Sequence, residues 1–242
     1  MFDEMAILWD YNLRMVPGIL AFLLCLVLLP RAAIGIRIAL YIALFILIRD
    51  AMTPTGLWAF DGLRISFIND GGVLAALGIA SVIGVLVVCA VEKEMRALLV
   101  WRKGSLVAGA GVGLGAGAVI GLGAASLSGF SPMLPDYAAG FIIGLFILAY
   151  GGNLLEELLF RGFLQGRLEQ IVTPVRAALL SGLLFAVCHS YLAITVTDAG
   201  WPILVFTAVE GIACGFVRLR YGIWAAALTH GTAIFLVSMP ML

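Results

Sequence analysis

Residues 71–91 read GGVLAALGIASVIGVLVVCAV and contain no charged side chain. A helix rises about 1.5 Å per residue, so this run would be roughly 30 Å long, which matches the hydrocarbon thickness of a bilayer. The stretch therefore predicts a helix that crosses a membrane.

The composition of the whole chain extends this prediction. Of its 242 residues, 63% are hydrophobic and only 12% are charged, whereas soluble domains carry about 25% charged residues. We expect an all-α, polytopic membrane protein in which residues 1–242 form a single transmembrane domain of about eight helices. The expected spans cover roughly residues 15–30, 32–49, 71–91, 105–127, 137–160, 175–195, 202–218 and 222–240. The glycine- and alanine-rich composition of the fourth span favours close contact between helix backbones.

The first apolar segment is expected to be retained as a helix. It follows Asp3 and Glu4 rather than a basic segment, and no small-residue cleavage site comes after it, so it does not resemble a cleaved signal peptide. The formal net charge is zero, which argues against a nucleic-acid partner. The expected surroundings are the lipid bilayer, with the cell membrane as the natural location.

The basic residues predict the orientation, because cytoplasmic loops of membrane proteins are enriched in lysine and arginine. One set of connections is expected to hold ten of them: Arg31, Lys93, Arg96, Arg102, Lys103, Arg161, Arg167, Arg176, Arg218 and Arg220. The opposite side is expected to hold Arg14, Arg49 and Arg64, and Arg37 falls inside the second span. This bias places both termini on the non-cytoplasmic side.

Ionisable side chains inside the apolar spans are the natural place to look for function, because the bilayer makes them costly. They are the pair Glu156 and Glu157 with Arg161, then His189, Glu210 and His230. The two histidines are the only ones in the chain. Because both histidines fall inside apolar helices, the sequence points to a buried polar site.

The stretch NLLEELLFR, residues 153–161, has a defined geometry if it is helical. Glu157 and Arg161 are four residues apart and share a face, so they can form an ion pair. Glu156 points about 100° away from Glu157, with Asn153 and Phe160 near it on its own face. One carboxylate can therefore be neutralised within the helix while the other faces elsewhere.

The glycine pair Gly151 and Gly152 leaves two possibilities for this helix. An unbroken helix over residues 136–170 would be roughly 50 Å long, more than the bilayer core needs. Either it tilts and extends into the cytoplasm, or it breaks at the glycines. In the second case Asn153 becomes a helix N-cap and Glu156 takes the third position of a capping box.

Two further segments carry the histidines. In FAVCH, residues 185–189, Phe185 and His189 share a helix face, and in AAALTH, residues 225–230, His230 lies within an apolar helix. A carboxylate and two imidazoles from three helices could converge on one water molecule.

These motifs resemble those of the CPBP family, which comprises CAAX-type prenyl-protein endopeptidases and bacteriocin-processing enzymes often called Abi proteins. The sequence EELLFR matches the family's EExxxR motif and FAVCH matches its FxxxH motif. The run GFVRLRYGIWAAALTH, which ends at His230, is similar to the family's last block. The resemblance covers roughly residues 137–236, so we expect N-terminal helices over 1–130 and a catalytic core over 131–242.

The resemblance implies a glutamic-type intramembrane endopeptidase that uses no cofactor. Glu156 would be the general base that activates water, and His189 would help to hold the water and the developing oxyanion. His230 would be the third member of the site, with Glu157 and Arg161 orienting the first motif and Phe185 supporting the second. The substrate would be a membrane-anchored protein or peptide, cleaved at a CAAX-type tail, a sorting tail or a leader peptide.

The chain departs from the family pattern at one position. Family members commonly continue the last motif as HxxxN, and here the fourth residue after His230 is Ile234. Glu210 is an additional carboxylate outside the quoted motifs, and Asn153 is a further candidate for the site.

Three other functions stay open on the sequence alone. A non-catalytic membrane scaffold or immunity protein could retain the motifs structurally, and the residue at Ile234 favours it. Two histidines and a glutamate could instead hold zinc with an open position for water, although HExxH spacing is missing. A proton-coupled transporter would also use buried Glu and His, but no repeated half is visible.

Overall fold

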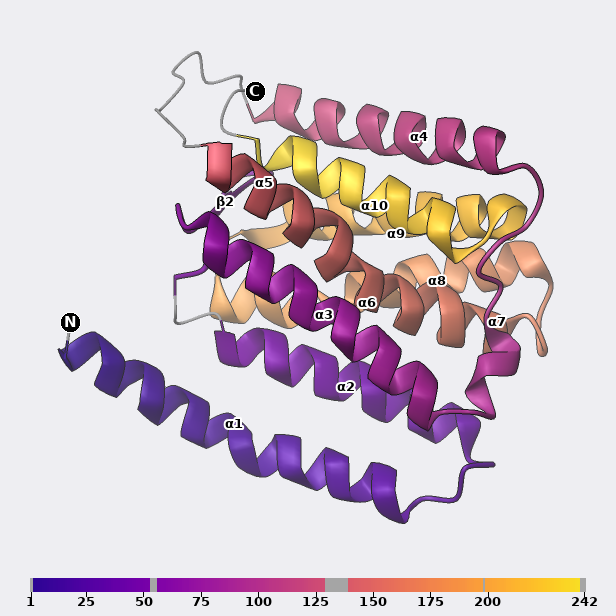
Figure 1. Cartoon of the computed structure of the whole chain (residues 1–242), viewed down its shortest axis with the longest axis horizontal. Coiled ribbons are helices and arrows are strands. Elements are labelled where there is room, and N and C mark those ends of the chain that lie inside the picture. Colours follow the sequence, from indigo (N-terminus) through magenta and orange to yellow (C-terminus); the bar gives the residue numbers. More distant parts are fainter. Residues whose placement is uncertain (1, 53–55, 129–138, 198, 240–242) are drawn as a thin grey trace.

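The computed structural model describes residues 2–52, 56–128, 139–197 and 199–239. Within these residues the chain is a bundle of helices that lie side by side, which confirms the all-α architecture (Figure 1). The α-helices are α1 (Phe2–Leu28), α2 (Ile34–Met52), α3 (Gly71–Val91), α4 (Leu106–Leu127), α5 (Ala139–Ile147), α6 (Asn153–Glu157), α7 (Gln165–Leu168), α8 (Pro174–Cys188), α9 (Gly200–Tyr221) and α10 (Ile223–Val237). The 3₁₀ turn η2 (Met95–Leu98) follows α3, and the π-helical segments are η3 (Leu148–Gly152), η4 (Leu158–Leu164) and η5 (Leu192–Val196).

Five helices in the described part of the chain are long and apolar enough to cross a membrane. They cover Gly71–Val91, Leu106–Leu127, Ala139–Leu168, Pro174–Ile194 and Gly200–Tyr221. Two shorter apolar helices lie at Asn12–Leu28 and Ile223–Val237. The chain is an integral membrane protein. The expected division near residue 130, and residues 137, 138 and 240 of the expected spans, lie outside the described residues.

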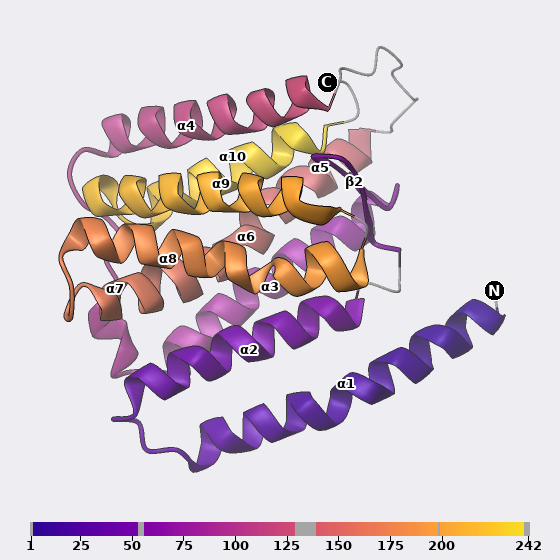
Figure 2. The ribbon, with the colours of Figure 1, turned by 180° about the vertical axis from the view of Figure 1, so that it is seen from behind.

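The N-terminal third differs from the sequence prediction in two ways. Helix α1 begins at Phe2 rather than near residue 15, so Arg14 lies within a helix, paired with Asp10 at 3.3 Å. The connection after α2 contains a hairpin of β1 (Trp58–Asp61) and β2 (Arg64–Phe67) in antiparallel register. Alternating half-buried side chains explain the hairpin, whose inner face packs beside α9. Helix α1 lies at one edge of the bundle and packs mainly on α2 (Figure 2).

The helix that carries the two adjacent glutamates does not break at its glycines. It runs continuously from Ala139 to Leu168, and Gly152 has helical dihedral angles, so the proposed N-cap at Asn153 is wrong. The glycine pair instead falls in η3, a π-helical turn. The Asn153 amide donates to the carbonyl oxygen of Ala149 at 2.7 Å, because its helix has no free amino end there to cap. Single π turns inside α-helices are frequent at functional sites.

The glycines of α4 bring it close to α10, as the composition predicted. Gly109, Gly113, Gly117 and Gly121 recur every fourth residue and are buried. A Cβ added at Gly117 would lie 2.4 Å from the carbonyl oxygen of Thr229, far inside van der Waals contact. The absence of a side chain there sets the position of α10 and therefore of His230, which follows Thr229 directly.

The turn between α9 and α10 depends on Gly222. Its φ of 94° lies in the region that glycine adopts at little cost, and a Cβ there would meet the carbonyl oxygen of Trp101 at 2.6 Å. This turn holds the two helices that carry Glu210 and His230 side by side.

A buried ion-pair cluster fixes the N-terminal helices to the rest of the bundle. Glu92, just beyond the end of α3, forms an ion pair with Arg37 of α2 and accepts a hydrogen bond from Tyr41 at 2.7 Å. Arg37 also donates to the carbonyl oxygens of Leu26 and Leu29 at the end of α1. Burial raises the pKa of Glu92, but the hydrogen bonds from Arg37 and Tyr41 outweigh it, so the pKa is lowered. The carboxylate is therefore ionised in the folded protein.

Candidate active site

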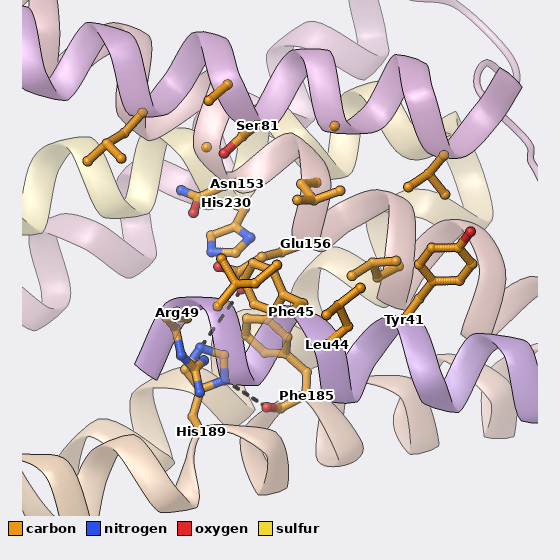
Figure 3. A pocket seen from close by; sticks show the side chains of 18 of the residues that line it. Tyr41, Leu44, Phe45, Arg49, Ser81, Asn153, Glu156, Phe185, His189 and His230 are labelled. Atoms are coloured by element: carbon orange, nitrogen blue, oxygen red, sulfur yellow. Dashed lines mark hydrogen bonds and ion pairs between the residues drawn. The ribbon is translucent and has the colours of Figure 1, made fainter. Parts of the chain in front are cut away.

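A cavity of about 790 Å³ lies inside the bundle. Its wall is mostly apolar, and it lies within the range of roughly 300–1,000 Å³ typical of ligand sites. Residues of α1, α2, α3 and the hairpin line it together with residues of the C-terminal helices. The N-terminal helices therefore form part of the cavity wall that faces the motif residues (Figure 3).

Glu156 and His189 face each other across this cavity. Glu156 comes from α6, His189 follows the last residue of α8, and the Oε2 and Nε2 atoms are 3.8 Å apart. Both side chains line the cavity and are largely buried. This separation is longer than a direct hydrogen bond but allows one water molecule to bond to both groups.

The second ring nitrogen of His189 is held by its own helix. Nδ1 lies 2.8 Å from the carbonyl oxygen of Phe185, one turn earlier. Because a carbonyl oxygen only accepts, Nδ1 carries the proton, and the neutral ring then presents an unprotonated Nε2 to the cavity. In this form His189 can accept a hydrogen bond from water but cannot donate one.

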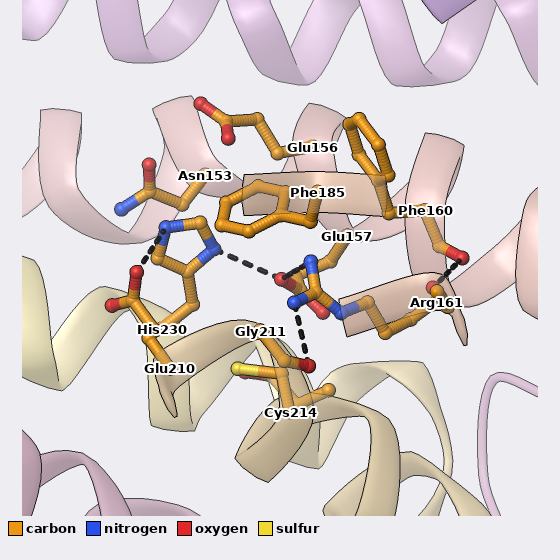
Figure 4. Close-up of polar contacts among 12 residues, drawn as sticks. Asn153, Glu156, Glu157, Phe160, Arg161, Phe185, Glu210, Gly211, Cys214 and His230 are labelled. Carbon is orange, nitrogen blue, oxygen red and sulfur yellow. Dashed lines mark hydrogen bonds and ion pairs between the residues drawn. The ribbon is translucent and has the colours of Figure 1, made fainter. Parts of the chain in front are cut away.

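Glu157 belongs to a separate, fully buried network behind the cavity wall (Figure 4). Its Oε1 lies 2.9 Å from Arg161 Nη1, which confirms the ion pair predicted from their spacing. The same oxygen lies 2.9 Å from His230 Nδ1, and Arg161 also donates to the carbonyl oxygen of Gly211 at 2.9 Å. The first and last motifs are thus connected through Glu157, a contact between helices that the sequence did not predict.

Phe185 packs against both histidines and against Arg161. Its ring centroid lies 4.5 Å from that of His189 and 5.5 Å from that of His230. The Arg161 guanidinium lies over the same ring at 4.4 Å, a cation–π contact. Phe185 is fully buried, so its ring fixes the orientation of both imidazoles.

Glu210, the carboxylate outside the family motifs, also lies at the site. Its Oε2 lies 3.6 Å from His230 Nε2, and both residues line the cavity. His230 Nδ1 carries a proton because it faces the Glu157 carboxylate. His230 is therefore held between two carboxylates.

The remaining sequence candidates also reach the cavity. Asn153 lines it beside Glu156, and Ile234 presents a hydrocarbon side chain where the family motif carries an amide. Among the described residues, no group of three or more His, Cys, Asp or Glu side chains is arranged to hold a metal ion.

Two arginines lie elsewhere than the sequence predicted. Arg161 was placed in a cytoplasmic connection and Arg49 in a connection on the opposite side, but both are buried in helices beside the site. The sequence did not predict that Arg49 is buried near the site, because an arginine at a helix end normally lies at the membrane surface. Its spacing from Arg37, Tyr41 and Phe45 along one face of α2 could have indicated that it faces inward.

No curated protein and no solved structure matches this chain. Residues 138–236 match the family model described as type II CAAX prenyl endopeptidase Rce1-like, which confirms the family resemblance predicted from the EExxxR and FxxxH motifs.

Proposed function

We propose that this protein is a glutamic-type intramembrane endopeptidase that hydrolyses a CAAX-type peptide held in the apolar cavity. The observation that carries the proposal is the separation of 3.8 Å between Glu156 and His189 on the cavity wall. The family match supports a CAAX-type membrane protease at the level of the family. Glu156 as the base, and the identity of the substrate, belong to the proposal.

In this mechanism a water molecule bonds to both Glu156 and His189. Glu156 removes a proton from the water as the oxygen attacks the carbonyl carbon of the scissile peptide. His189 accepts the second hydrogen of the water at Nε2 and so directs a lone pair towards the substrate. When the tetrahedral intermediate collapses, the C–N bond breaks and Glu156 returns its proton to the departing amine.

His230 is proposed as the third member of the site. Glu157 and Arg161 fix one side of its ring, and its Nε2 faces Glu210 at the cavity wall. Glu157 and Arg161 act in this scheme as positioning residues, because neither lines the cavity.

The proposed substrate is a protein or peptide with a lipid-anchored CAAX tail, because the cavity offers apolar walls on α1, α2 and α3 for an acyl or prenyl chain. We also propose the cell membrane as the location, with both termini on the non-cytoplasmic side. With Arg49 and Arg161 left out, the basic residues still favour this orientation.

The test uses purified protein in liposomes with a farnesylated peptide that ends in a CAAX sequence. We expect release of the terminal tripeptide, identified by mass spectrometry, and no release by Glu156→Gln. Glu156→Gln keeps the size of the side chain, so circular dichroism and thermal unfolding should match those of the wild type. Cleavage by Glu156→Gln at the wild-type rate would rule out the proposed mechanism.

Three further experiments address the other candidate substrates and functions. The same peptide without its farnesyl group shows whether the lipid is required, and a comparison of membrane peptides from cells with and without the protein detects sorting tails or leader peptides. Ile234 in the cavity wall is the observation that favours a non-catalytic scaffold, and a wild-type protein inactive in every assay would support it. Treatment with 1,10-phenanthroline is expected to leave the rate unchanged, whereas a loss restored by zinc would favour the metal mechanism.

A further inference from the structure

Arg49 lies beside the reacting pair although it comes from α2, outside the region that matches the family model. It lines the same cavity as Glu156 and His189, and its guanidinium lies next to the His189 ring (Figure 3). Its Nη2 donates to the carbonyl oxygen of Cys188, the residue before His189, at 3.1 Å. The side chain is only 8% exposed, so this cation is buried.

The position of Arg49 along its helix agrees with that of His189. Arg49 is fifteen residues after the first residue of α2, and His189 is fifteen residues after the first residue of α8. Both therefore lie about 22 Å along helices that begin on the same, basic side of the bundle. Arg37, Tyr41, Phe45 and Arg49 form one face of α2 that lines the cavity.

The proposed hydrolysis needs a hydrogen-bond donor that the motif residues do not supply. Attack of water moves the carbonyl π electrons onto the oxygen, and this oxyanion needs donors about 2.7–3.1 Å away. Neutral His189 has no proton on Nε2, because Nδ1 donates to Phe185. His230 faces Glu157 and Glu210, and Ile234 offers only hydrocarbon.

We propose that Arg49 is a further catalytic residue that donates to the scissile carbonyl oxygen and stabilises the oxyanion. A guanidinium has five N–H donors, so it can keep its bond to Cys188 and meet a substrate oxygen at the same time. Its positive charge lies in a largely apolar cavity, where it acts more strongly than in water. The C–O π pair moves to the oxygen beside Arg49 during the attack and returns when the C–N bond breaks, so Arg49 gives up no proton. This inference rests on the proposed endopeptidase activity.

Arg49 also has a possible structural role that the test must separate from catalysis. A cation that donates to the last carbonyls of a helix stabilises its C-terminus, and Arg49 does this for α8. Loss of that bond would reduce stability or substrate binding. It would not specifically weaken the binding of a compound that imitates the tetrahedral intermediate.

The experiment compares wild type, Arg49→Met, Arg49→Lys and Arg14→Met with two probes. The probes are the farnesylated CAAX peptide and an analogue in which a phosphonate replaces the scissile carbonyl. Arg14 is the control because it is an exposed arginine of α1 that pairs with Asp10 and does not line the cavity. Cleavage by the wild type is required first, and its absence would contradict the proposed function rather than the role of Arg49.

For Arg49→Met we expect kcat to fall about 100- to 1,000-fold, the loss typical for one oxyanion donor, with KM within threefold. The inhibition constant of the phosphonate should rise by the same factor as kcat/KM falls. The control variant Arg14→Met should change neither constant more than threefold. A folded Arg49→Met with kcat within threefold of wild type, or with unchanged phosphonate affinity, would overturn the proposal. If Arg49→Met does not fold, Arg49→Lys decides, because it keeps the charge but loses the planar donor group. An unchanged phosphonate inhibition constant in Arg49→Lys would also overturn the proposal.

Discussion

Glu156 and His189 belong to different helices, yet their Oε2 and Nε2 atoms lie 3.8 Å apart on the wall of one cavity. Each is held by its own helix: His189 by its bond to Phe185, and Glu156 by a helix whose next residue, Glu157, is fixed in a buried ion pair. The adjacent glutamates thus have different surroundings, one facing the cavity and one in the protein interior.

This relationship predicts non-additive losses of activity. His189→Ala alone and Glu156→Ala alone should each reduce kcat on the farnesylated peptide at least 100-fold, because both groups act on one water molecule. The kcat of the double variant should lie within about threefold of the kcat of the slower single variant, as for residues that act as a unit. Losses that multiply in the double variant would show that the two residues act independently.

Phe185 should matter for stability as well as for activity. Phe185→Ala removes a fully buried ring that contacts both histidines and Arg161, and large-to-small changes of this kind cost about 3–5 kcal/mol. The matched control is Leu184→Ala, next to it in sequence and 41% exposed. Unfolding in detergent should show a clear loss for Phe185→Ala and little change for the control. Equal midpoints for the two variants would contradict the packing role.

The contact of α4 with α10 can be tested with one methyl group. Gly117→Ala would place a Cβ 2.4 Å from the carbonyl oxygen of Thr229, so α10 must shift and His230 with it. Gly115→Ala, half a turn away, meets no atom within 4 Å. We expect Gly117→Ala to lower both the unfolding temperature and the cleavage rate, and Gly115→Ala to change neither. A wild-type rate in Gly117→Ala would show that the helix contact does not position the site.

The Glu92 cluster predicts a pH dependence of stability. The folded state lowers the pKa of Glu92 below its ordinary value of 4.5. A lowered folded pKa stabilises the protein above the unfolded pKa, and this contribution is lost as the pH falls through the folded pKa. Glu92→Gln leaves Arg37 buried without its counter-ion and should cost roughly 3–5 kcal/mol at pH 7.

The difference between wild type and Glu92→Gln should shrink as the pH falls below 4.5, because the unfolded wild-type chain then takes up a proton at Glu92 and the folded protein does so only at a lower pH. Chemical unfolding at a series of pH values measures this difference. A gap that stays constant down to pH 3 would show that the charge of Glu92 does not stabilise the fold.

The sequence predicted those features that depend on local spacing. The apolar runs indicated the helices, and the four-residue spacing predicted the ion pair of Glu157 with Arg161. The glycine- and alanine-rich composition of the fourth span indicated a close helix contact. Each follows from the geometry of a single helix, so no knowledge of the tertiary structure was needed.

Features that depend on packing between helices were not predictable in this way. The bond of Glu157 to His230 joins residues 73 positions apart, and Arg49 reaches Cys188 across 139 positions. The glycine pair was compatible with both a break and a continuous helix, because glycine tolerates each. In the continuous helix, Gly151 packs against Gly78 of α3. The sequence of one helix does not reveal such a contact with another helix.

The central claim is that a water molecule lies between Glu156 and His189, and a high-resolution experimental map of the wild-type protein in lipid tests it most directly. We expect an ordered oxygen about 2.6–3.2 Å from both the Glu156 carboxylate and His189 Nε2. A map in which the Glu156 carboxylate turns away from the cavity, beyond the reach of a shared water, would contradict it.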